Sequence, residues 1–134
     1  NAEMVICDKH RKRANEIASM VVIGDVTDKD VVIIDDICDT AGTLAKAAGL
    51  LKDKGARTVR AMVTHPVLSG KAYANIAGSV LEELVVCDTI PLKPGAPDKV
   101  KVISVSELFA VAIRNAYENK SINNLFIHSQ RRDK

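Results

Sequence analysis

The chain has 134 residues, of which 47% are hydrophobic and 27% charged, and its formal net charge is +2. This length suits one domain, the composition excludes a disordered chain, and no apolar run approaches the roughly 20 residues that cross a bilayer. The small charge and 3% aromatic content argue against a nucleic-acid partner. Three cysteines without CxxC spacing fit reduced thiols better than a disulfide framework or a zinc site, so we expect a soluble, cytoplasmic protein with no membrane partner.

Short β-rich apolar runs alternate with helical patterns along the chain, which predicts an α/β fold with a largely parallel sheet flanked by helices. The sequence shows no internal repeat and no second domain boundary, so residues 1–134 are expected to form one domain. The predicted strands are "MVIC", "SMVVIG", "DVVIID", "RTVRAMVT", "ELVVCD" and "VKVISV", and the predicted helices are "TLAKAAGLLKDKG", "GKAYANIAG" and "SELFAVAIRNAYEN".

The third strand and the helix after it carry the most information. Residues 31–34 are apolar without interruption, which predicts a central strand with both faces covered. Thr43 opens a helix whose apolar side chains recur at helical spacing, and Gly55 is a credible stop. The apolar positions of this predicted helix are Leu44, Ala47, Ala48 and Leu51.

The connection between this strand and helix has the features of an anion-binding site. It lies at a helix N-terminus, where backbone N–H groups and the helix dipole favour negative charge. Gly42 allows close approach of a ligand, and Thr40 and Thr43 add hydroxyl donors. Asp35 and Asp36 would repel a phosphate in contact with them, so they suit hydroxyl groups or magnesium on another part of the same ligand. A pentose phosphate is the simplest molecule that satisfies both halves.

A structural role without a ligand explains the same spacing about equally well. In that interpretation Asp35 and Asp36 end a strand, and Asp39 or Thr40 caps a helix. A P-loop is excluded because no lysine follows the glycine, and the acidic residues do not follow the pattern of a calcium-binding loop. His65, alone at a strand end before Pro66, is expected to be a hydrogen-bonded turn residue without a chemical role.

Several separated motifs resemble one enzyme family. "VVIIDDICDTAGTL" is similar to the phosphoribosyl-diphosphate binding signature of the type I phosphoribosyltransferase fold. Together with "DKHRKRANE", "THPVLSG", "ELVVCDTIPL" and "SINNLF", it resembles ribose-phosphate diphosphokinase, also called phosphoribosyl-diphosphate synthetase. The resemblance implies Mg2+-dependent transfer of the β,γ-diphosphoryl group of ATP to the anomeric hydroxyl of ribose 5-phosphate, which supplies nucleotide biosynthesis.

The resemblance also implies roles for individual residues. It places residues 39–43 around the 5-phosphate, and Asp35 and Asp36 at the ribose hydroxyls. Lys9 and Arg11 correspond to the catalytic pair of the family's mobile flap, where they would neutralise charge on the transferring group. His10 and Lys12 replace the arginine and proline typical of that flap. The residues implied at the 5-phosphate are Asp39, Thr40, Ala41, Gly42 and Thr43.

The C-terminal motif and the extent of the match complete this set of expectations. Ser121 and Phe126 match the family's regulatory site for phosphate and ADP, whereas Asn123 replaces a smaller residue. The family's ATP-binding motifs lie in an N-terminal half that these residues do not contain, so the chain is expected to be the C-terminal domain of a two-domain synthetase and inactive alone. Family members commonly form hexamers, which implies a homo-oligomer.

Two other functions fit the same residues. A salvage phosphoribosyltransferase shares the fold and the binding loop, but "DKHRKR" and "SINNLF" argue against it. A non-catalytic regulatory partner would keep the fold and join oligomers of the synthetase, whereas Lys9 and Arg11 favour catalysis.

Overall fold

The computed structural model describes residues 3–13 and 16–126, and for residues 8–13 and 16–19 it describes the backbone alone. The first compact unit ends at Ile103, and the second begins at Ser104. All six predicted strands and all three predicted helices are present. The elements are β1 (Ile6–Arg13), β2 (Glu16–Ile23), β3 (Asp30–Cys38), α1 (Gly42–Asp53), β4 (Thr58–Pro66), α2 (Ala72–Ala77), β5 (Glu83–Cys87), β6 (Val100–Ile103), α3 (Ser106–Tyr117) and the 3-10 turn η1 (Asn123–Leu125).

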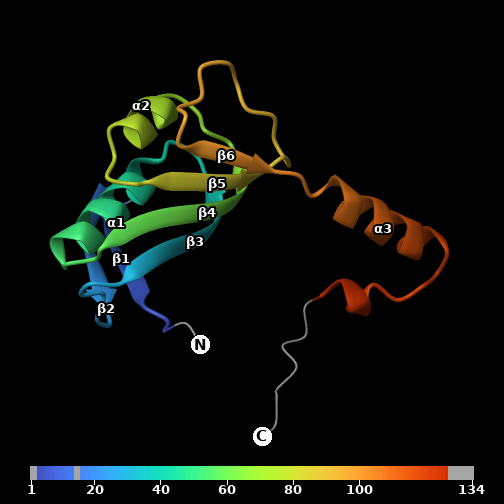
Figure 1. Cartoon of the computed structure of the whole chain (residues 1–134), viewed down its shortest axis with the longest axis horizontal. Helices are drawn as coiled ribbons and strands as arrows, with labels where there is room; N and C mark the ends of the chain where they lie inside the picture. The colour runs from blue at the N-terminus through green and yellow to red at the C-terminus, as the bar shows by residue number, and fades with distance from the viewer. Residues whose placement is uncertain (1–2, 14–15, 127–134) are drawn as a thin grey trace, which may run out of the picture. The chain divides into compact units, whose positions relative to one another are not determined.

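The first unit is built on a four-stranded parallel sheet in the order β3-β4-β5-β6 (Figure 1). Strands β1 and β2 form a separate antiparallel pair. Each parallel connection runs through a crossover, so the carboxyl ends of all four strands meet at one edge of the sheet. The α/β class, with a largely parallel sheet flanked by helices, is therefore confirmed.

Helix α1 packs on the sheet through the four apolar residues that the spacing predicted, and all four are buried. Its end is a Schellman motif, in which Gly55 adopts a left-handed φ of 91°. The N–H of Gly55 donates to the carbonyl of Lys52 at 2.9 Å, and that of Ala56 to the carbonyl of Leu51 at 3.1 Å. Ala72 and Ile76 of α2 join the same core. This packing fixes where α1 begins relative to the end of β3.

The prediction that residues 31–34 form a central strand with both faces covered is wrong. Strand β3 is at the edge of the four-stranded sheet, and its burial alternates along residues 30–34. Val32 is 49% exposed and Ile34 is 70% exposed. An uninterrupted apolar run predicts a strand but does not specify what covers each face. In the described part of residues 1–103, helix α1 packs against the other face of β3.

The second unit contains α3 and η1. Helix α3 has an amphipathic sequence, but in the described part of the unit none of its residues is buried. Asn115 donates from its side-chain amide to the main-chain carbonyl of Ser121 at 3.2 Å, and the main-chain N–H of Asn123 donates to the Ser121 hydroxyl at 3.1 Å. The first bond ties the segment after α3 to the helix, and the second lies within that segment.

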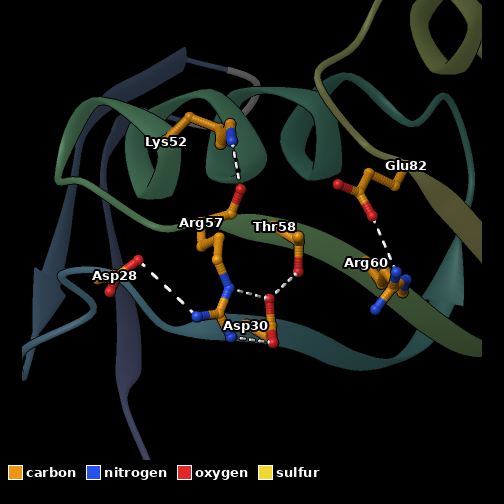
Figure 2. A network of polar contacts seen from close by, with 7 residues as sticks. All are labelled: Asp28, Asp30, Lys52, Arg57, Thr58, Arg60 and Glu82. Carbon is orange, nitrogen blue, oxygen red and sulfur yellow. Dashed lines mark hydrogen bonds and ion pairs between the residues drawn. The ribbon is translucent and has the colours of Figure 1, made fainter.

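A polar network joins the amino ends of β3 and β4 (Figure 2). Arg57 donates from Nε to Asp30 Oδ1 at 3.0 Å and forms a second bond to Oδ2, while Thr58 donates its hydroxyl to Asp30 Oδ1 at 2.7 Å. Hydrogen bonds from Arg57, followed by those from Thr58, lower the pKa of Asp30 from 3.8 to about 2. The network thus favours the ionised carboxylate at the end of the sheet opposite to the strand ends that precede α1.

The lowered pKa of Asp30 predicts an acid dependence of stability. A group with a depressed pKa in the folded state stabilises that state above its unfolded pKa, and the contribution disappears as the pH falls through the folded value. Asp30→Asn should therefore lower the free energy of unfolding at neutral pH, and its difference from the wild type should shrink between about pH 4 and about pH 2. Denaturant titrations across this range measure the difference. A gap that is constant with pH would contradict the assignment.

Candidate functional site

The candidate site lies where β3 ends and α1 begins. Only Asp39, Thr40 and Ala41 separate the strand from the helix, and Ala41 turns the chain with a left-handed φ of 58°. Ala41 is buried, and its carbonyl accepts the first helical hydrogen bond from Ala45 at 2.9 Å. The strand, the helix and this buried turn therefore determine the shape of the loop together.

The start of α1 is suited to an anion. Ala41 occupies the N-cap position and makes no side-chain capping bond, and the first helical turn contains no acidic residue. The positive end of the helix dipole is thus not neutralised by a carboxylate of its own first turn. A Cβ added to Gly42 would lie 3.7 Å from Thr40 Oγ1 and 3.9 Å from Asn75 Nδ2. The glycine is therefore not required by crowding within the protein, which agrees with a role in admitting a ligand.

Asp35 and Asp36 are exposed at the carboxyl end of β3. Asp35 Oδ1 accepts the backbone N–H of Asp36 at 3.0 Å, and Asp36 Oδ1 accepts that of Ile37 at 2.8 Å. These local bonds hold the carboxylates near the strand and outside the Asp39–Thr43 loop. The two acids and the helix start are therefore neighbouring but separate parts of the site.

A groove of about 1090 Å3 runs beside β3 and α1. Asp35 and Thr43 both line it, together with apolar side chains of the strand and helix, whereas Asp36 and residues 39–42 do not. The structure thus brings one predicted carboxylate and one predicted hydroxyl around a common space. Asp36, Asp39 and Thr40 are exposed at the strand end, whereas Gly42 is half-buried and Ala41 is buried.

Sequence reasoning missed a second loop, residues 67–71 between β4 and α2, that contacts the first. Leu68 donates its N–H to the Cys38 carbonyl at 3.1 Å, and Ser69 donates its N–H to the Asp39 carbonyl at 3.0 Å. Ser69 also donates its hydroxyl to the Asp39 carboxylate, and Asn75 Nδ2 donates to the Thr40 carbonyl at 2.8 Å. The spacing of residues within "THPVLSG" does not predict these contacts, and the sequence marks that motif only through its resemblance.

His65 is a hydrogen-bonded residue at the end of β4, as the sequence predicted. Its Nδ1 lies 3.0 Å from Thr89 Oγ1, and the Thr89 hydroxyl donates to the Thr64 carbonyl at 2.9 Å. Because that hydroxyl has a single proton, it accepts from His65, which places a proton on Nδ1.

The other predicted site residues lie elsewhere. Lys9 and Arg11 belong to β1 and pair with Met20 and Ile17, with a register irregularity after His10, but their side chains lie outside the described part of the structure. Ser121 and Phe126 belong to the second unit, and both are exposed.

Among the described residues, no three His, Cys, Asp or Glu side chains gather into a possible metal site. No helix in the described ranges is both long and apolar enough to cross a membrane. The three cysteines are free, and burial raises the pKa of the Cys38 thiol beside the loop, which favours its protonated form.

Comparison with known proteins gives consistent matches. Residues 5–127 match the family model described as the phosphoribosyl synthetase-associated domain. The chain is 58% identical over 125 residues to a ribose-phosphate pyrophosphokinase of Campylobacter jejuni, covering 93% of the chain and 40% of that protein. A ribose-phosphate pyrophosphokinase of Porphyromonas gingivalis is 50% identical over 123 residues. This match covers 92% of the chain and 39% of that protein. The chain thus spans about 40% of the length of these relatives.

A solved structure supports the fold independently. The crystal structure of phosphoribosylpyrophosphate synthetase from Mycobacterium smegmatis aligns with a TM-score of 0.72 at 36% sequence identity, covering 78% of this chain and 35% of that chain.

Proposed function

The chain belongs to the family of the phosphoribosyl synthetase-associated domain, and on this basis we propose that it forms the ribose 5-phosphate-binding part of a ribose-phosphate pyrophosphokinase. The complete enzyme would transfer the β,γ-diphosphoryl group of ATP to the anomeric hydroxyl of ribose 5-phosphate, with release of AMP. The observation that carries the proposal is the anion-suited start of α1, which follows two exposed carboxylates at the end of β3.

The two parts of the site would bind the two ends of the sugar phosphate. The loop of Asp39, Thr40, Ala41, Gly42 and Thr43 would hold the 5-phosphate through backbone N–H groups, hydroxyl groups and the helix dipole. Asp35 and Asp36 would accept hydrogen bonds from the ribose hydroxyls. Because the carboxylates lie outside the loop, they would not repel the phosphate at close range.

Magnesium fits this arrangement as an ion shared with substrate oxygens. Mg2+ is usually held by one or two carboxylates together with substrate phosphates and water. Asp35 and Asp36 are the candidate protein ligands, and their local hydrogen bonds use only the Oδ1 atoms. When bound, the ion would neutralise charge on the phosphoryl groups.

Lys9 and Arg11 are proposed to act on the transferring group. The anomeric oxygen would attack the β-phosphorus as the bond from that phosphorus to the α–β bridging oxygen breaks. Phosphoryl transfer depends mostly on positioning and electrostatic stabilisation, so cations are effective at this point. Both residues lie on β1, whose Cys7 lines the same groove as Asp35.

The rest of the enzyme would supply what these residues lack. We propose that the chain is the C-terminal half of a two-domain synthetase whose other half binds ATP. The full-length protein would be a cytoplasmic homo-oligomer, assembled as a hexamer. Phosphate and ADP would act as regulators through Ser121 and Phe126. The coverage of about 40% of each relative supports a larger enzyme.

Replacing Asp35 or Asp36 should show which part of the site binds which end of the ligand. Asp35→Asn or Asp36→Asn, made in the full-length protein that carries this chain, should weaken ribose 5-phosphate binding about tenfold to a hundredfold, the usual range for hydrogen bonds to a charged group. Inorganic phosphate should bind as to the wild type, because the loop is unchanged. Calorimetry with each ligand measures both effects. Equal loss of the two ligands would contradict the proposed division.

Replacing Lys9 should test its role in the transition state. Lys9→Ala in the full-length protein should lower kcat about a hundredfold to a thousandfold and leave both Michaelis constants nearly unchanged, since the proposed contact strengthens as charge develops. Lys54→Ala, an exposed lysine at the far end of α1, is the matched control and should have no effect. Steady-state kinetics decide the outcome. Unchanged kcat for Lys9→Ala would make that lysine a solvated residue without a catalytic role and favour a non-catalytic regulatory partner.

A further inference from the structure

We propose that Ser69 and Asn75 are positioning residues that hold the anion-binding loop in the shape its ligand requires. The inference rests on the proposed function, because the loop is the proposed 5-phosphate site. Neither residue was a candidate from the sequence, and both act through the loop rather than on the reacting atoms.

The segment that contains both residues binds three successive carbonyl groups of the loop. The carbonyls of Cys38 and Asp39 accept the N–H groups of Leu68 and Ser69, and that of Thr40 accepts the Asn75 amide. In a planar trans peptide, the carbonyl and the N–H of the next residue point in opposite directions. The N–H groups of Asp39 and Thr40 are therefore directed away from this segment, where they can donate hydrogen bonds to an anion.

The Ser69 hydroxyl also determines where the Asp39 carboxylate lies. A carboxylate beside an anion-binding loop would repel a phosphate if it turned toward it. In the structure, Asp39 Oδ1 accepts the Ser69 hydroxyl, and the backbone N–H of Ser69 binds the Asp39 carbonyl at 3.0 Å. The two bonds keep the acid engaged with the second loop. Ser69 thus reduces the repulsion between the Asp39 carboxylate and a phosphate at the proposed site.

Asn75 is supported by the core and reaches the start of α1. Ala72 and Ile76, on the same helix, are fully buried, which fixes the position of α2. Asn75 Nδ2 is 2.8 Å from the Thr40 carbonyl and 3.9 Å from the position that a Cβ on Gly42 would occupy. The amide group therefore contacts the loop next to Ala41, whose left-handed backbone is costly for a residue other than glycine and persists only when its surroundings hold it.

The test compares variants that remove one hydrogen bond each in the full-length protein. Asn75→Ala and Ser69→Ala remove a bond to the loop, while Ser69→Thr keeps the hydroxyl. The matched control is Tyr73→Phe, which removes the bond from the Tyr73 hydroxyl on the same helix to the Lys93 carbonyl at 2.8 Å, away from the loop. Calorimetry gives the affinity for inorganic phosphate and ribose 5-phosphate, kinetics give KM and kcat, and thermal unfolding gives Tm.

Asn75→Ala should weaken the binding of both ligands about threefold to tenfold, as expected for the loss of a hydrogen bond between neutral groups. Ser69→Ala should weaken it about tenfold, because the lost hydrogen bond is to a charged carboxylate. The KM for ribose 5-phosphate should rise while kcat stays unchanged, because the loop binds a phosphate that does not react. Ser69→Thr should bind like the wild type. Tyr73→Phe should lower Tm as much as Asn75→Ala but leave both affinities unchanged.

The results separate the two proposals. If the wild type binds neither ligand, the proposed function is wrong and this inference fails with it. If the wild type binds both and the Asn75→Ala and Ser69→Ala proteins bind equally well, only the positioning role is overturned. Affinity losses that Tyr73→Phe reproduces would also overturn it, because they would reflect general destabilisation. If Asn75→Ala does not fold, the comparison of Ser69→Ala with Ser69→Thr decides alone.

Discussion

The site depends on the short connection between a parallel strand and the helix after it. Only three residues connect β3 to α1, and the position of α1 is fixed by buried side chains such as Leu44 and Leu51. Ala41 makes this turn with a left-handed backbone, and the three carbonyls before it accept hydrogen bonds from Leu68, Ser69 and Asn75. The fold therefore places backbone donors at the carboxyl end of the strands, where ligands of parallel α/β sheets bind.

The distribution of charge follows from the same connection. Asp35 and Asp36 are still part of the strand, and the helix begins only after the turn, so negative side chains and the positive end of the helix dipole are kept apart along one short segment. Asp39, the acid within the loop, is bound by Ser69. A ligand with an anion at one end and hydroxyl groups at the other matches this separation, whereas a simple dianion uses only half of it.

The sequence predicted those features that depend on local pattern. The spacing of Leu44, Ala47, Ala48 and Leu51 predicted the buried face of α1, and alternating strands and helices predicted the fold class. The edge position of β3 was not predictable, because a run of apolar residues does not say which neighbours the strand has. The bonds from Ser69 and Asn75 join residues 30 and 35 positions apart, so no local spacing reveals them. Lys9 and Arg11 remain predictions that rest on resemblance.

The most direct test of the central claim is an NMR titration of the chain with three ligands, following the backbone amide signals. Ribose 5-phosphate should shift the signals of residues 39–43 and also those of Asp35 and Asp36. Inorganic phosphate should shift residues 39–43 alone, and ribose without phosphate should bind too weakly to shift either set at the same concentration. Ribose 5-phosphate shifts confined to residues outside the β3–α1 connection would contradict the account, as would phosphate shifts centred on Asp35 and Asp36.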